Sequence, residues 1–303
     1  MKKMKLLAGI MIASLLLIGS GCGQVNVQDD QASSSPSSAK TTAAASNEIE
    51  TEATTEAKVT LSGTLTLTGS TSMADVSNAL AESFMLENPG VTISVGGNGS
   101  GEGPTAVNDG TAQIGLLSRG LKDSETPENF DQYIIGYDGI AVIVNSESEV
   151  KELTLEQVAQ IYKGEITNWS EVGGKDAPIH AIGREAASGT RGAFEEILKV
   201  KDECIYTEEQ NSTGSVKQSV TSNPNAIGYV SLSAVDETVH AVSLNGVTPS
   251  IDTVNNGDYE LQRPFLMITT KSSSDELTQA FMSYVFSSEG MMIVADDGVV
   301  PNS

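Results

Sequence analysis

Apolar and polar positions along the chain alternate with two periods, one typical of strands and one typical of helices. Thr64–Thr68 alternates residue by residue, which predicts a strand with one buried face. Met73–Asn88 repeats apolar residues every three or four positions, which predicts an amphipathic helix that ends at Pro89-Gly90. Further strands are predicted at 91–95, 113–117, 133–144 (interrupted at 138–139), 179–182, 226–230 and 265–269, and further helices at 105–108, 155–162, 190–198, 212–221 and 277–286. This alternation predicts an α/β fold with mainly parallel sheets.

Three of these strands lead into helices through turns rich in glycine and hydroxyl side chains. The turns are Gly69–Ser72, Gly96–Gly103 and Gly183–Phe194. Ligands of open α/β sheets bind beyond the carboxyl ends of the strands. A helix N-terminus there offers free N–H groups and a partial positive charge. Arg184 can add a charge-assisted contact, so the pattern predicts a site for an anion.

A simpler interpretation of each turn is an ordinary helix cap. Ser188 or Thr190 would then only cap the helix that follows. The glycine-rich loop lacks the Gly-Lys-Ser/Thr of a phosphate-binding P-loop, and its spacing does not match a dinucleotide-binding fingerprint. Both interpretations stay open at this point.

Composition narrows the class of partner. The formal net charge is −23, which disfavours nucleic acid and anionic lipid as partners. A small anion is still acceptable, because surface charge is screened within about 8–10 Å and backbone dipoles need no positive protein. The acidic residues are spread along the chain and form no EF-hand pattern, so we expect neither a metal nor a cofactor.

The N-terminal segment is typical of an exported protein. Residues 1–21 combine three lysines with the apolar run Leu6–Ile18 and end in small residues before Cys22, which predicts a signal peptide. The segment resembles a lipoprotein signal, so we expect lipidation of Cys22. Residues 22–58 are polar and predict a disordered tether. The other cysteine, Cys204, then has no partner for an intrachain disulfide.

Several motifs together resemble the phosphate-binding lipoproteins of bacterial phosphate ABC importers, in their Gram-positive form. The resemblance covers residues from about 60 to 303. The motifs are GSTSM (69–73), GNGSGEG (97–103), IGLLSRGL (114–121), YDGIAVIVN (137–145), ITNWSEVGG (166–174), GREAASGTR (183–191) and NPNAIGYVSL (223–232). The family implies a type II periplasmic-binding-protein fold, in which two lobes joined by a hinge enclose the ligand. Its lobes would comprise residues 59–145 with 241–303, and residues 146–240.

The resemblance also implies a set of phosphate-binding residues. They are Ser70, Thr71 and Ser72 in the first turn, Ser100 in the glycine-rich loop, and Arg184, Ser188, Gly189 and Thr190 on the other lobe. It further implies that the protein does no chemistry. It would deliver inorganic phosphate to the permease and ATPase subunits of an importer, from a lipid anchor on the extracellular face of the cell membrane.

One residue of the proposed site rests on chemistry as well as on resemblance. Hydrogen phosphate carries a proton, so a selective site needs an acceptor among its donors. Some relatives have an aspartate where this chain has Arg119. Asp138 is our candidate instead, because a carboxylate accepts from phosphate and repels sulfate. The alternative is an aspartate that only stabilises a turn before Gly139.

Three other functions stay open. The first is a binding protein for another oxyanion, such as sulfate or molybdate. The second is a secreted phosphate-ester hydrolase that uses Ser188, although His180 and His240 have no recognisable partner acid and the GxSxG motif is absent. The third is a surface adhesin.

Overall fold

The computed structural model describes residues 60–302, and the predictions for the signal peptide, Cys22 and the whole tether lie outside these residues. The strands are β1 (Ser62–Gly69), β2 (Gly90–Gly96), β3 (Ile114–Leu117), β4 (Phe130–Asn145), β5 (Glu152–Leu153), β6 (His180–Arg184), β7 (Glu208–Gln210), β8 (Ala226–Ser231), β9 (Val239–Ala241), β10 (Ser243–Leu244), β11 (Gln262–Thr270) and β12 (Val300–Pro301). The α-helices are α1 (Ala74–Glu87), α2 (Glu102–Asn108), α3 (Leu155–Tyr162), α4 (Gly189–Ile197), α5 (Thr213–Ser222), α6 (Ile251–Asn255), α7 (Glu276–Val285) and α8 (Ser288–Asp296).

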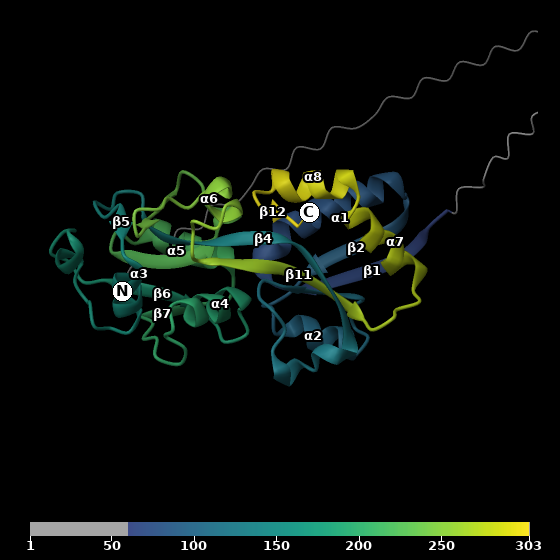
Figure 1. Ribbon diagram of the computed structural model, residues 1–303, viewed down its shortest axis with the longest axis horizontal. Helices are drawn as coiled ribbons and strands as arrows, with labels where there is room; N and C mark the ends of the chain where they lie inside the picture. The colour runs from purple at the N-terminus through teal and green to yellow at the C-terminus, as the bar shows by residue number, and fades with distance from the viewer. Residues whose placement is uncertain (1–59, 303) are drawn as a thin grey trace, which may run out of the picture. The chain divides into compact units, whose positions relative to one another are not determined.

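Most of the strands form one sheet, with the order β2-β1-β3-β11-β4-β8-β6-β7. The strands at each end are parallel: β1 pairs with β2 and β3, and β6 pairs with β7 and β8. In the middle, β11 is antiparallel to both β3 and β4, and β4 is antiparallel to β8. The prediction of mainly parallel sheets is therefore wrong for the centre, because β4 and β11 run side by side in opposite directions (Figure 1).

The buried side chains divide into separate cores at the two ends of β4 and β11. The first core lies between β1–β3 and helices α1, α7 and α8, and the second lies around β8, α3 and α4. On β4, Ile135 belongs to the first core and Ile140 to the second. On β11, Phe265 belongs to the first and Leu261 to the second. The chain thus crosses from one core to the other within a few residues on each strand.

Most predicted elements are confirmed, and the differences have physical causes. The strand β4 continues through Asp138-Gly139 without the interruption that the pattern indicated, because both residues pair in register with β11. The pattern did not predict the short strands β5, β7, β9, β10 and β12 or the helices α6 and α8. Glu208–Gln210 has no apolar residue and is held by its pairing with β6, while α6 is a five-residue helix.

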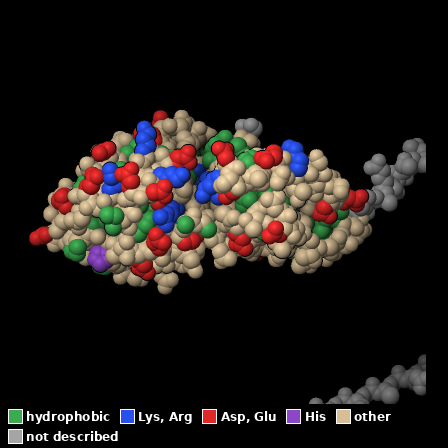
Figure 2. All heavy atoms as spheres, turned by 90° about the horizontal axis from the view of Figure 1, so that it is seen from below, with side chains coloured by type: hydrophobic (Ala, Val, Ile, Leu, Met, Phe, Trp, Pro, Cys, Tyr) green, Lys and Arg blue, Asp and Glu red, His purple; other side chains and the backbone are tan. Residues whose placement is uncertain are grey.

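Most of the α-helices begin directly after a serine, threonine or aspartate whose side chain caps the helix. The N-cap side chains of α3 to α8 accept a backbone N–H, and they are Thr154, Ser188, Ser212, Ser250, Asp275 and Ser287. Helix α1 has no such cap and follows a 3-10 turn at Thr71–Met73. Acidic side chains are scattered over the face shown in Figure 2, as expected for solvated surfaces. Within residues 60–302, no helix is both long and apolar enough to span a membrane.

Candidate functional site

The first turn depends on Gly69, the last residue of β1. Its φ is +137°, and a Cβ there would lie 2.2 Å from the carbonyl oxygen of Leu116, so only glycine fits. The chain can then place Ser70, Thr71 and Ser72 directly beyond the strand end. The Ser70 hydroxyl donates to the Ser118 hydroxyl at 2.8 Å and does not cap the helix.

The glycine-rich loop brings Ser100 to the same place. The backbone N–H of Gly99 donates to the carbonyl of Gly69 at 2.9 Å, which ties the loop to the first turn. Ser100 is completely buried, and its Oγ accepts from the backbone N–H of Ser118 at 3.0 Å. Ser118 therefore links Ser70 to Ser100. The sequence analysis did not single out Ser118, although it ends the strand in the IGLLS motif.

The third turn, between β6 and α4, meets the other two. The backbone N–H of Gly101 donates to the carbonyl of Ala187 at 3.0 Å. A Cβ on Gly189 would lie 2.1 Å from Ser100 Oγ and 2.6 Å from Ser118 Oγ, so the start of α4 is packed directly against the two serines. Ser188 caps α4, because its Oγ accepts from the N–H of Arg191, and the proton of the same hydroxyl stays free to donate to a ligand.

A second group of hydroxyls lies at the junction of the three turns. Ser72 Oγ lies 2.9 Å from Thr190 Oγ1 and 3.1 Å from Thr213 Oγ1. Thr71 Oγ1 lies 3.3 Å from Thr213 Oγ1 and accepts from the N–H of Thr213. Sequence reasoning missed Thr213, although Ser212-Thr213 precedes a predicted helix in the same way as the other turns. The three turns thus meet, together with the start of α5.

Arg184 is the cation of this group. Its side chain is only 2% exposed, and it donates to both carboxylate oxygens of Glu185, at 3.1 and 2.9 Å. Its Nη1 has one distant contact, 3.5 Å from Thr213 Oγ1. Nη1 of Arg184 can therefore donate further hydrogen bonds on the side where the hydroxyls of Ser72 and Thr213 lie.

Asp138 occupies a different environment from the one expected. It is completely buried within β4 and therefore does not stabilise a turn, so that alternative is wrong. Its Oδ1 accepts from the Ser231 hydroxyl at 2.7 Å, and its Oδ2 accepts from Nε and Nη2 of Arg263 at 3.1 and 2.9 Å. Burial raises the pKa of Asp138, and Arg263 opposes this shift. Within residues 60–302 it has no hydrogen bond to the three turns, and sequence reasoning missed its partner Arg263.

Other residues considered at the start lie apart. Arg119 is buried, and its guanidinium is bound by both oxygens of Glu125, at 2.8 and 2.6 Å. Neither His180 nor His240 forms a hydrogen bond with Ser188 in the described part of the chain, so the arrangement of a hydrolase is not seen there. No cluster of metal-ligating side chains occurs among residues 60–302.

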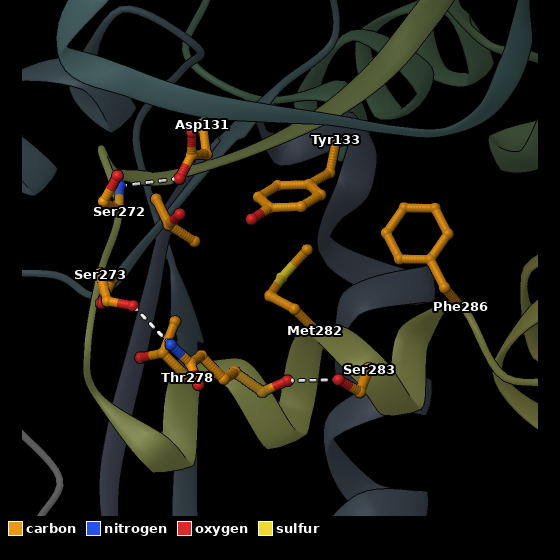
Figure 3. A pocket seen from close by; sticks show the side chains of 10 residues that line it. Asp131, Tyr133, Ser272, Ser273, Thr278, Met282, Ser283 and Phe286 are labelled. Carbon is orange, nitrogen blue, oxygen red and sulfur yellow. Dashed lines mark hydrogen bonds between the residues drawn. The ribbon is translucent and has the colours of Figure 1, made fainter.

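Two pockets of about 470 Å³ are present, and one of them adjoins the turns. That pocket is lined by Thr71, Ser72 and Thr213, with Lys217 and Asp236 at its rim. The other lies by the first core, between the ends of β4 and β11 and helix α7, where Figure 3 shows Tyr133 and Met282 beside one another. The turns, and not this second pocket, bring together the predicted binding residues.

A half-buried carboxyl group with a raised pKa, Asp297, lies outside the three turns. Asp297 follows α8, and burial, with smaller contributions from Asp75 and Asp138, raises its pKa to about 6. Its Oδ2 has no hydrogen-bond partner in the part of the chain that the structure describes. Because this pKa exceeds the ordinary value of 3.8, the folded state prefers the protonated form, and stability falls as the pH rises through 6.

Replacing Asp297 with asparagine is therefore expected to stabilise the protein above pH 6 and to have little effect near pH 4. The gain should be about 1 kcal/mol, since the group is partly open to solvent and the effect is screened. Urea denaturation at pH 4, 5, 6 and 7 measures the difference between variant and parent. A difference that is constant over this range contradicts the assignment.

Comparison with known proteins gives a consistent result. A family model described as a PBP superfamily domain matches residues 39–289. The phosphate-binding protein PstS of Bacillus subtilis is 31% identical over 99% of this chain and 95% of its own length. The PstS protein of Pseudomonas aeruginosa is 30% identical over 80% of this chain and 84% of its own length.

Solved structures agree with the relatives. A structure from Clostridium perfringens, presented as a candidate phosphate ABC transporter substrate-binding protein with bound phosphate, is 39% identical with a TM-score of 0.77. The match covers 80% of this chain and 100% of that one. An ABC-type phosphate transport receptor from Vibrio cholerae is 33% identical with a TM-score of 0.66, over 78% of this chain and 100% of the receptor. The chain belongs to the PBP superfamily and, within it, to the family of the PstS phosphate-binding proteins.

Proposed function

We propose that the protein captures inorganic phosphate between two lobes and delivers it to an ABC-type importer. The observation that carries this proposal is the meeting of the three strand-to-helix turns, with Arg184, in one buried group of hydroxyls and backbone N–H groups. Such a group presents mostly donors, which suits a small tetrahedral oxyanion. The names of the relatives and the phosphate bound in the C. perfringens structure support phosphate as the ligand.

The donors would come from both sides of the junction. On one side, Thr71 and Ser72 open the 3-10 turn that leads into α1, and no side chain caps this helix start. On the other side, Thr190 and Thr213 belong to the first turns of α4 and α5. The hydroxyl contacts between Ser72, Thr190 and Thr213, at 2.9 and 3.1 Å, are short enough for one oxyanion to be held by all three.

The boundaries of the two lobes that would enclose the ligand follow from the two hydrophobic cores. The sequence-based division placed the return to the first lobe at residue 241. Val242, Leu244 and Leu261 pack in the second core. We therefore propose that the second lobe comprises about residues 140–261, with hinges in β4 and β11. Closure around the ligand would bend these two strands.

The protein would act by binding alone, without chemistry on the ligand. The closed, loaded form would dock on the permease, whose ATPase subunits drive import. A lipid on Cys22 would hold the protein at the extracellular face of the membrane. Globomycin, which blocks cleavage of lipoprotein signals, should cause the uncleaved precursor to accumulate, and Cys22→Ala should prevent lipid labelling.

Calorimetric titration of the purified protein with phosphate, sulfate, molybdate and arsenate tests the ligand. Phosphate should bind, and above its Kd it should raise the melting temperature by an amount that grows with the logarithm of its concentration. At 100 times Kd the stabilisation is about 2.7 kcal/mol. Tighter binding of sulfate or molybdate would contradict phosphate as the ligand, and a melting temperature that no oxyanion changes would contradict a binding function.

Gly189→Ala is expected to weaken phosphate binding by about tenfold or more. The new methyl group would lie 2.1 Å from Ser100 Oγ, so the turns would have to move apart. Gly192→Ala in the same helix is the matched control, because its methyl group would meet only the Cδ of Arg119 at an ordinary 3.5 Å. Equal phosphate affinities for the two variants would show that the close approach of Gly189 does not matter for binding.

A further inference from the structure

Arg263 lies where β11 crosses from one core to the other. It pairs in register with Asp138 of β4, so the two charged residues face each other across neighbouring strands. The Arg263 side chain is 1% exposed and the Asp138 side chain is 0% exposed. Leu261 belongs to the second core and Phe265 to the first, so this ion pair lies where the chain crosses from one core to the other.

The guanidinium of Arg263 is only partly used. Two of its nitrogens, Nε and Nη2, donate to the same oxygen of Asp138. The third, Nη1, is buried and has no hydrogen-bond partner among residues 60–302. A buried charged donor without a partner carries its full desolvation penalty, so native proteins rarely leave one and its presence needs a specific explanation.

A second buried guanidinium lies nearby. Burial lowers the pKa of Arg263, Asp138 opposes this shift, and the Arg184 guanidinium adds to the lowering. The two cations are thus close enough to repel one another. Arg184 also keeps an Nη1 with only a distant partner, Thr213 Oγ1 at 3.5 Å. Two neighbouring guanidinium groups with spare donors are the chemistry that recognises an oxyanion.

We propose that Nη1 of Arg263 donates to an oxygen of the bound phosphate, so that the site holds its ligand with two guanidinium groups. This inference rests on the proposed function. Arg184 provides the cation on the second lobe, and Arg263 provides one from the crossing strand. Asp138 then holds Arg263 in place through two nitrogens, and Ser231 fixes Asp138. A hinge residue would in this way contact the ligand directly.

Two substitutions of Arg263 and one control test this role. Arg263→Lys keeps the charge next to Asp138 but offers one nitrogen in place of three, so it should fold with a similar melting temperature and bind phosphate at least about tenfold more weakly. Arg263→Met should also lower the melting temperature. Arg119→Met removes another buried arginine, whose two terminal nitrogens are both paired with Glu125, and it should lower the melting temperature with a Kd within about threefold of the parent.

The outcomes separate this inference from the proposed function. A parent protein that binds no phosphate contradicts the function itself. A folded Arg263→Lys variant with a parental Kd, beside a parent that binds, contradicts only the role of Arg263. A crystal structure of the unmodified protein with phosphate decides without any variant: the inference requires Nη1 within about 3 Å of a phosphate oxygen. A water molecule on Nη1, with no phosphate contact, overturns it.

Discussion

Replacing Arg184 with alanine is expected to reduce the free energy of phosphate binding by on the order of 2–5 kcal/mol. The side chain is 2% exposed, so an anion in contact with it would meet its charge without intervening solvent. Removing it would also leave the carboxylate of Glu185 near the anion without its cation. Isothermal titration calorimetry of variant and parent with phosphate gives the difference directly.

A matched variant distinguishes a direct contact between Arg184 and the anion from the effect of the overall charge of the protein surface. Lys217→Ala removes one positive charge at the rim of the pocket beside Thr213, where Lys217 pairs with Asp236 at the surface. Its effect on binding should be less than about 1 kcal/mol. If Arg184→Ala costs less than about half a kcal/mol, Arg184 does not contact the ligand. Similar losses for the two variants would mean that the field of the whole surface, and not a direct contact, attracts the anion.

Asp138→Asn is expected to lower the free energy of unfolding by about 3–5 kcal/mol, measured by urea denaturation without phosphate. The side chains are nearly equal in size, so the effect reports charge. The variant leaves the guanidinium of Arg263 buried next to a neutral amide. Asp131→Asn on the same strand is the control, because Asp131 pairs with Lys271 at the surface and its loss should matter little. Equal stability of the two variants would contradict the structural importance of the Asp138 pair.

The same variant tests the selectivity of the site. Asp138 Oδ1 accepts one hydrogen bond, from Ser231, and a carboxylate oxygen has room for a second. If that second position receives the proton of hydrogen phosphate, Asp138→Asn should narrow the gap between phosphate and sulfate affinity. Calorimetry with both anions measures the ratio. An unchanged ratio would end this role and leave Asp138 as the residue that positions Arg263.

The sequence predicted those parts of the fold that local pattern determines. The hydroxyl-rich turns were visible because β1 and β6 end in motifs that combine glycine with serine and threonine, and their meeting followed from the rule that strand ends share one edge. The sequence did not show that Arg263 pairs with Asp138, because 125 residues separate them and only the antiparallel register of β4 and β11 brings them together. The sequence also did not show that β4 continues through Gly139, because this too depends on the pairing of β4 with β11.

The site was predicted less completely than the fold. Ser118 and Thr213 connect the predicted hydroxyls, yet neither lies in one of the three turns that the sequence marked as binding turns. The signal for Thr213 was present, since Ser212-Thr213 opens a helix as Ser188–Thr190 does, but nothing local indicates which helix starts face the junction. That depends on the order of strands in the sheet, which is a property of the whole chain.

The pairing of β4 with β11 has a consequence for how the molecule can move. These crossing strands are hydrogen-bonded neighbours from Gln262 to Thr270, with one irregularity between Phe265 and Leu266. Two joined strands resist twisting far more than two separate linkers would, so the flexible direction is out of the plane of the ribbon. Amide hydrogens along the ribbon should therefore exchange slowly with deuterium whether or not the ligand is present, while those of the turn at Gly99–Gly101, which join the turns, should gain protection when it is bound.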